Sequence, residues 1–95
     1  MQRSYAWVAQ ASQGDLPVYG VNTGFGSLAR VRIPPEDSEQ LSVNLIRSHA
    51  AGVGKPVPVE AARAMMLLRA NALSKGVSGC RPLLVDTLIA MLNRG

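Results

Sequence analysis

Two segments near the C-terminal end constrain the fold most, because both are apolar around most of their circumference. Residues 58–75 contain the run Ala-Ala-Arg-Ala-Met-Met-Leu-Leu, and residues 82–93 carry Leu, Val, Ile and Met on more than one face. A helix that is apolar on all sides is normally buried on all sides. The rest of a 95-residue chain supplies too few partners, so large apolar patches would stay exposed if it stood alone. The sequence therefore predicts a piece of a larger assembly.

Composition favours one small, mainly α domain over residues 1–95. Hydrophobic residues make up 47% of the chain and aromatic residues only 4%, a mixture that suits helices packed on helices. Apolar spacing and the Pro and Gly positions predict helices at 2–13, 37–51, 58–75 and 82–93, with mostly loop at 18–35. We expect the last two helices to pack antiparallel across the turn at 76–81.

Charge and cysteine content argue against several classes of partner. Ten Lys and Arg against six Asp and Glu give a net charge of +4, but the basic residues form no run and are not interleaved with aromatics. Nucleic-acid binding is therefore not expected. One cysteine, Cys80, and one histidine, His49, cannot form a disulfide framework or a structural metal site alone. No apolar run reaches the ~18 residues of a membrane span, and no signal peptide is recognisable, so we expect a soluble, cytoplasmic protein without a membrane partner.

The loop at 18–35 contains Tyr-Gly-Val-Asn-Thr-Gly-Phe-Gly at residues 19–26. Glycines at this density indicate positive φ angles or close approach of the backbone to another group. A phenol on such a loop, Tyr19, suits proton transfer because the backbone fixes its position. Residues 24–29 also match the dinucleotide pattern G-x-G-x-x-A, but the Pro-Pro pair at 34–35 and the lack of an acidic residue near 44 disfavour that interpretation.

Ser-His-Ala-Ala-Gly at residues 48–52 carries the single histidine. Together with the Tyr19 loop, this segment resembles the N-terminal part of the histidine ammonia-lyase family, the aromatic amino-acid lyases and aminomutases, over residues from about 18 to 95. The resemblance implies the mainly α N-terminal helical part of the fumarase/aspartase-like superfamily, with a long glycine-rich active-site loop. It also implies a cytoplasmic homotetramer whose substrate is an aromatic amino acid.

The resemblance assigns roles to four positions. Tyr19 would be the catalytic base or proton shuttle, and His49 would contact the side chain of the substrate, where an imidazole suits a polar ring. Asn22 and Gly26 would help to bind the substrate through backbone N–H groups, although we expect the segment 22–26 mainly to shape the loop. L-Histidine, converted to urocanate, is the expected substrate; a tyrosine or phenylalanine lyase, or an aminomutase, is the alternative within the family.

The family's electrophile, methylidene-imidazolone, forms from an Ala-Ser-Gly tripeptide, and this chain contains none. We therefore expect residues 1–95 to be a truncated N-terminal domain that needs the rest of its own polypeptide and is inactive alone. The implied reaction is elimination of ammonia, without a metal. A hypothesis of another class remains open, namely a non-catalytic helical module that binds an anionic or apolar partner, motivated by the +4 charge and the apolar helices.

Overall fold

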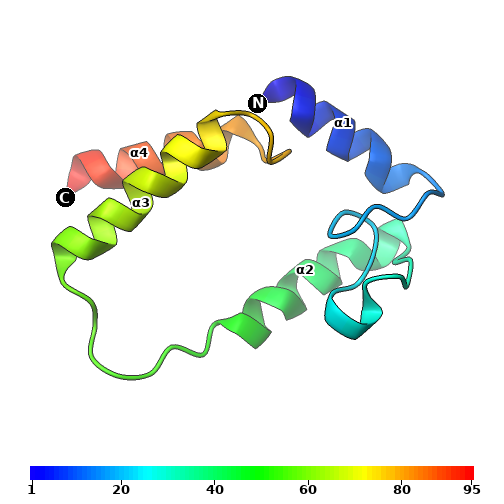
Figure 1. The fold of residues 1–95 in the computed structure, drawn as a ribbon, viewed down its shortest axis with the longest axis horizontal. Helices are drawn as coiled ribbons and strands as arrows, with labels where there is room; N and C mark the ends of the chain where they lie inside the picture. The colour runs from blue at the N-terminus through cyan, green and yellow to red at the C-terminus, as the bar shows by residue number, and fades with distance from the viewer. The chain divides into compact units, whose positions relative to one another are not determined.

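The computed structural model describes all 95 residues and is built from helices (Figure 1). The α-helices are α1 (Gln2–Gln13), α2 (Pro35–His49), α3 (Val59–Ser74) and α4 (Pro82–Arg94). The connection between α1 and α2 contains a short 3₁₀ helix, η1 (Gly26–Leu28), and one isolated antiparallel bridge between Thr23 and Arg32. There is no strand, which confirms the predicted mainly α class.

Proline and acidic residues explain where α2 begins. The helix starts at Pro35, slightly before the predicted residue 37, because a proline at the first helical position loses no hydrogen bond. Glu36 and Asp37 lie in its first turn, where negative charge stabilises the positive end of the helix dipole. Arg47 and His49 lie in the last turn, where positive charge is favourable.

The chain divides into two compact units, which are described separately. One unit comprises Met1–Trp7 and Lys55–Gly95, and the other comprises Val8–Gly54. The first contains α3 and α4, and the second contains the glycine-rich loop and α2.

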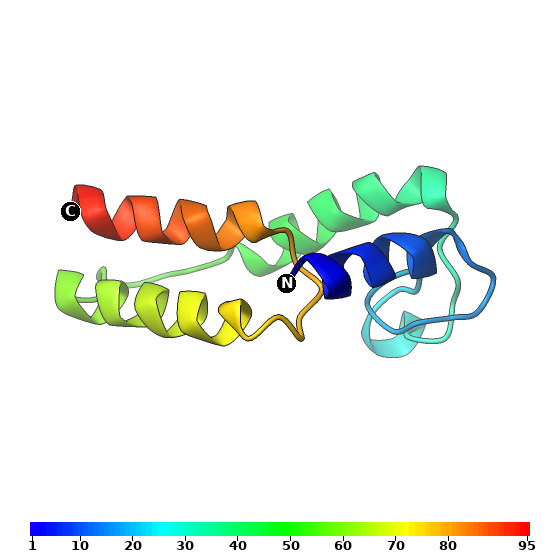
Figure 2. The same cartoon turned by 90° about the horizontal axis from the view of Figure 1, so that it is seen from above.

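Helices α3 and α4 form an antiparallel pair, as the sequence predicts (Figure 2). Ala70 of α3 and Val85 of α4, 5% and 7% exposed, are the only buried hydrophobic residues of the chain. The Arg63 guanidinium on α3 donates a 2.8 Å hydrogen bond to the Leu92 carbonyl, close to the C-terminal end of α4. This bond satisfies one of the carbonyls that a helix end leaves without an intrahelical partner.

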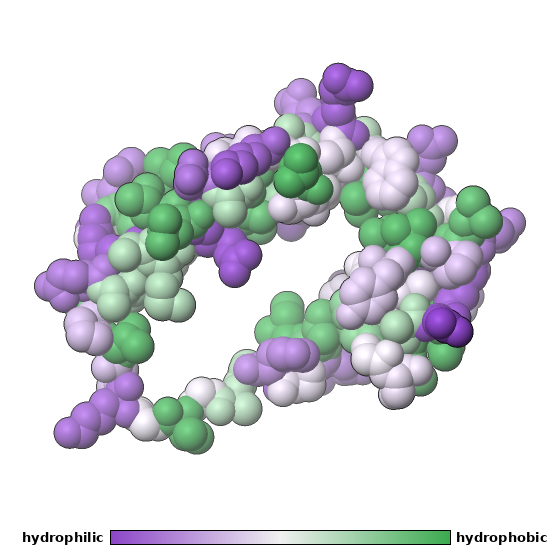
Figure 3. Space-filling model, viewed as in Figure 1, coloured by the Kyte–Doolittle hydropathy of each residue, from purple (hydrophilic) through white to green (hydrophobic).

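Many large apolar side chains of this pair are exposed. The space-filling view shows apolar surface among the polar side chains (Figure 3). Met65, Leu67 and Leu68 on α3 are 65%, 60% and 67% exposed, and Leu83 and Met91 on α4 are exposed as well. One helix hairpin cannot cover two helices that are apolar on more than one side, so the prediction of exposed apolar patches is confirmed. None of the helices is long and apolar enough to cross a membrane.

Candidate active site

One asparagine organises the connection between α1 and α2. The Asn22 side chain is 3% exposed, and its Oδ1 accepts a 2.7 Å hydrogen bond from the backbone N–H of Val18. Its Nδ2 donates to three backbone carbonyls, those of Ala11 at 3.2 Å, Gly14 at 3.2 Å and Leu16 at 3.0 Å. Buried backbone groups need hydrogen-bond partners, and an irregular loop lacks the backbone-to-backbone bonds of a helix or sheet. The Asn22 side chain therefore serves as the partner of these four backbone groups.

Thr23 and a short bridge close the other side of the loop. The Thr23 hydroxyl, on a side chain that is 1% exposed, accepts a bond from the Gly20 N–H and donates a 3.0 Å bond to the Gly24 carbonyl. The backbone then pairs at both ends of the bridge, with Ile33 N–H to Asn22 carbonyl at 2.8 Å and Gly24 N–H to Val31 carbonyl at 3.0 Å. These bonds fix the base of the loop that carries residues 24–31.

The structure leaves no room for a side chain at position 24. A Cβ atom at this position would lie 2.6 Å from the Leu28 Cβ and 2.9 Å from the Leu28 carbonyl oxygen. Backbone atoms cannot give way as a flexible side chain can. The close approach that the glycine density predicted is therefore real at Gly24, while Gly26 adopts a positive φ of 57° with open space around it.

Tyr19 lies at the start of this loop and packs against Phe25. The two rings meet edge to face, with centroids 6.0 Å apart and planes inclined by 75°. Such a pair contributes about 0.5–1.5 kcal/mol beyond the burial of area. The tyrosine remains 65% exposed, so its hydroxyl is held by the ring contact while being reachable from outside.

His49 is the last residue of α2, and its ring is tied to the helix end. The His49 Nδ1 lies 2.9 Å from the Leu45 carbonyl oxygen and 3.0 Å from the Ser48 Oγ. The Ser48 hydroxyl itself donates to the same carbonyl at 2.8 Å. The imidazole is therefore oriented by its own helix, while the residue as a whole is exposed.

The histidine lines a hollow of about 430 Å³ together with Phe25, Leu45 and Ile46. Phe25 therefore links the two predicted functional residues, because it packs on Tyr19 and lines the same hollow as His49. All of these residues belong to the unit Val8–Gly54, so the arrangement lies within one body. An apolar hollow with one imidazole in its wall can receive a small ring. The Tyr19 phenol does not line the hollow, but it packs on Phe25, which does, and it is exposed enough for proton exchange.

Asn22 and Gly26, the other two predicted site residues, differ in burial: Asn22 is buried and Gly26 is exposed. Asn22 uses its side chain inside the loop, and its backbone N–H donates to the Val18 carbonyl at 3.2 Å. Gly26 is exposed at the turn beside Phe25. The geometry thus favours loop shaping at Asn22, and substrate binding at both positions stays a prediction.

The sequence pattern does not single out the apolar side of the hollow. Phe25 falls in the segment 22–26, which is expected mainly to shape the loop, and Leu45 and Ile46 are not among the predicted site residues. A signal was present, because Leu45 and Ile46 precede His49 by four and three residues and so share its helix face.

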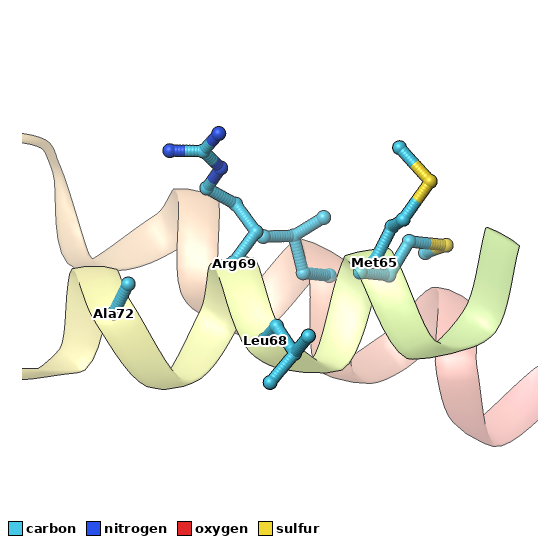
Figure 4. A pocket seen from close by; sticks show the side chains of 6 residues that line it. Met65, Leu68, Arg69 and Ala72 are labelled. Carbon is cyan, nitrogen blue, oxygen red and sulfur yellow. The ribbon is translucent and has the colours of Figure 1, made fainter. Parts of the chain in front are cut away.

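A second hollow lies on the α3–α4 pair and offers little chemistry. It measures about 550 Å³ and is lined by Met65, Met66, Leu68, Arg69, Ala72 and Leu88 (Figure 4). Arg69 is its only charged residue, and no acid or base accompanies it. This hollow has the character of an uncovered packing surface. No group of three or more His, Cys, Asp or Glu residues in the chain is arranged to hold a metal ion.

Comparison with known proteins decides the family. The model of a family described as aromatic amino acid lyase matches residues 1–95, the whole chain. The chain belongs to the aromatic amino acid lyase family. Histidine ammonia-lyases of Geobacillus thermodenitrificans and Anaeromyxobacter sp. (strain K) are each 56% identical to it over 95 residues. A probable histidine ammonia-lyase of Halobacterium salinarum is 48% identical over the same length.

The match covers 100% of this chain but only 18% or 19% of each of these relatives. The chain thus spans about a fifth of the length of the aromatic amino acid lyases that it matches. Its residues do not fit the formation of the electrophile expected for the family, because no Ala-Ser-Gly occurs among them. Any such group has to come from outside residues 1–95.

Proposed function

We propose that residues 1–95 form the N-terminal part of a histidine ammonia-lyase, which removes ammonia from L-histidine to give urocanate. The observation that carries the proposal is the 56% identity over the whole chain to proteins named histidine ammonia-lyase. The geometry supports it, since the Tyr19 and His49 of the sequence prediction share Phe25 as a neighbour.

In this proposal the chain contributes binding and proton transfer. The Phe25 ring holds the Tyr19 phenol at the loop, where its hydroxyl exchanges a proton with the substrate. The His49 imidazole and the apolar wall of Phe25 and Ile46 receive the ring of the amino acid, and Gly26 offers a backbone N–H at the turn. The methylidene-imidazolone, which would supply the electron-withdrawing centre, belongs to the part of the enzyme outside this chain.

The same proposal covers the whole enzyme. We propose that the complete protein is a cytoplasmic homotetramer, that residues 1–95 are inactive without the rest of the polypeptide, and that no metal is needed. Tyrosine or phenylalanine lyase and aminomutase activities are the alternatives within the family. The alternative of another class is a non-catalytic helical binding module, and the exposed apolar side chains of α3 and α4 are the observation that favours it.

The test is a chimera in which residues 1–95 replace the matching segment of the Geobacillus thermodenitrificans relative, which is 56% identical. We expect turnover of L-histidine to urocanate, measured by ultraviolet absorbance. Tyr19→Phe in the chimera should lower kcat by about 100-fold or more, the usual contribution of a general acid or base.

Tyr5→Phe is the matched control, because it removes the same hydroxyl from an exposed tyrosine on α1 outside the loop. It should leave kcat unchanged. A chimera that folds and assembles but does not turn over histidine would contradict the proposed function. Equal losses from the two phenylalanine variants would contradict the role of Tyr19.

A further inference from the structure

The single imidazole of the chain makes an asymmetric set of contacts. Its Nδ1 lies within hydrogen-bonding distance of two oxygens, the Leu45 carbonyl at 2.9 Å and the Ser48 Oγ at 3.0 Å. The Ser48 hydroxyl lies 2.8 Å from the same carbonyl and donates to it. One ring nitrogen is thus committed to the end of α2, and Nε2 is the polar ring atom left for a ligand.

The chemistry of these oxygens selects one tautomer. A backbone carbonyl can only accept a hydrogen bond, so a 2.9 Å contact with Nδ1 is favourable only if Nδ1 carries the proton. The other neutral tautomer would place the Nδ1 lone pair against the lone pairs of the carbonyl oxygen, which is repulsive. The Ser48 hydroxyl can rotate to donate to Nδ1 at 3.0 Å instead of to the carbonyl at 2.8 Å. The Nδ1 lone pair would still lie 2.9 Å from the carbonyl oxygen, and that carbonyl would lose its bond from the serine.

We propose that the Leu45 carbonyl locks the neutral His49 ring in its Nδ1–H tautomer, so that Nε2 presents a lone pair at the hollow lined by Phe25 and Ile46. The hollow then takes a small ring that donates an N–H or O–H to Nε2, and a ring that carries only acceptors is rejected. The ligand part of this inference rests on the proposed role of His49, whereas the tautomer does not. The Leu45 carbonyl acts as a positioning group.

The tautomer is measured directly in the 95-residue chain. His49 is its only histidine, so all imidazole signals of a sample labelled with ¹⁵N-histidine come from this one residue. The spectrum is recorded at about pH 9, above the range in which an ordinary imidazole is protonated. We expect the Nδ1–H form to predominate in the native chain and the Nε2–H form, which free histidine favours, to predominate in concentrated urea.

Ser48→Ala tests whether the Leu45 carbonyl or the Ser48 hydroxyl fixes the tautomer of His49. It should retain the Nδ1–H form, because the Leu45 carbonyl stays in place, and Ser42→Ala on the same helix is the matched control for loss of a serine-to-carbonyl bond. A native ring that is mainly Nε2–H overturns the proposal. A return to Nε2–H in Ser48→Ala alone also overturns it, since the serine would then be the lock.

The ligand class is tested with two probes, imidazole and 1-methylimidazole. Both are small rings with an acceptor nitrogen, but only imidazole has an N–H to donate. Titration of the native chain with imidazole should move the Nε2 signal of His49, and the methylated probe should move it less. Equal shifts would overturn the ligand class while leaving the proposed lyase function untouched, because that function is judged by turnover in the chimera.

Discussion

Individual polar side chains, rather than regular secondary structure, hold the residues of the candidate site in place. Asn22 and Thr23 are the two buried polar residues of the chain, and between them they bond the backbone on both sides of the loop. No buried side-chain nitrogen or oxygen is left without a partner. The position of Tyr19 and Phe25 therefore depends on two short side chains that contact no substrate in the proposed function.

Asn22→Asp should disrupt the loop although the two side chains have nearly the same shape. The aspartate loses both amide donors and turns a negative charge towards the three carbonyls that Asn22 bonds. We expect a loss of about 1–3 kcal/mol in the free energy of opening of this segment, the cost of leaving buried polar groups unpaired. Amide hydrogen exchange of residues 18–24 measures it.

Asn44→Asp is the matched control for this change. Asn44 is exposed on α2, and its side-chain oxygen accepts a hydrogen bond from Gln40, which an aspartate can also accept. Exchange in the loop should stay as in the parent chain. A loop that is equally protected in Asn22→Asp would show that the Asn22 amide does not organise it.

His49→Leu should change the substrate preference more than the chemistry. Removal of the imidazole takes away the partner of a polar ring, so kcat/KM for histidine should fall by about 10-fold or more, while an apolar ring no longer leaves a polar group unpaired. The measurement is kcat/KM for histidine, tyrosine and phenylalanine in the active chimera, before and after the substitution. Equal losses on the three substrates would assign His49 to the chemistry or the scaffold instead.

At the scale of elements, the helices could be predicted from the sequence because their ends are marked locally. Prolines fix the first turns of α2 and α4, and glycines follow the ends of α2 and α3. The interior of the loop could not be predicted in the same way. The bonds from Asn22 to Ala11 and Gly14 join residues 11 and 8 positions apart, and no local spacing rule specifies them. The hollow beside His49 escaped prediction for the same reason, since Phe25 reaches it from a different element.

Ala70→Leu tests the contact between α3 and α4. Ala70 is 5% exposed in the pair, so three added carbons have no free space and the helices must separate or the side chain must leave its preferred rotamer. Overpacking of this kind costs about 1–3 kcal/mol, which should lower the urea midpoint followed by circular dichroism.

Ala61→Leu adds the same atoms at an exposed position of the same helix. Its effect should stay within about 0.5 kcal/mol, as for most surface substitutions. Equal midpoints for the two leucine variants would mean that Ala70 is not at a packed interface and that α3 and α4 pair in another register.

At the scale of the whole molecule, the chain exposes much more apolar side-chain surface than its small core can bury. The buried apolar core consists of Ala70 and Val85, whereas large apolar side chains are exposed on every α-helix. In the family relatives, segments of this kind belong to chains about five times as long, since the match covers about 19% of their length. The apolar runs within residues 58–75 and 82–93 are enough to predict this imbalance.

The exposed apolar surface predicts that the 95-residue chain binds a hydrophobic dye such as anilinonaphthalene sulfonate. Met65 and Leu68 are exposed and line the larger hollow, so Met65→Gln with Leu68→Gln should reduce the dye fluorescence while preserving helicity, because glutamine is a good helix former. Asn71→Gln, at an exposed polar position of α3, should leave the fluorescence unchanged. A parent chain that is a monodisperse monomer and silent to the dye would mean that these side chains are covered in solution, and residues 1–95 would then be a self-sufficient domain.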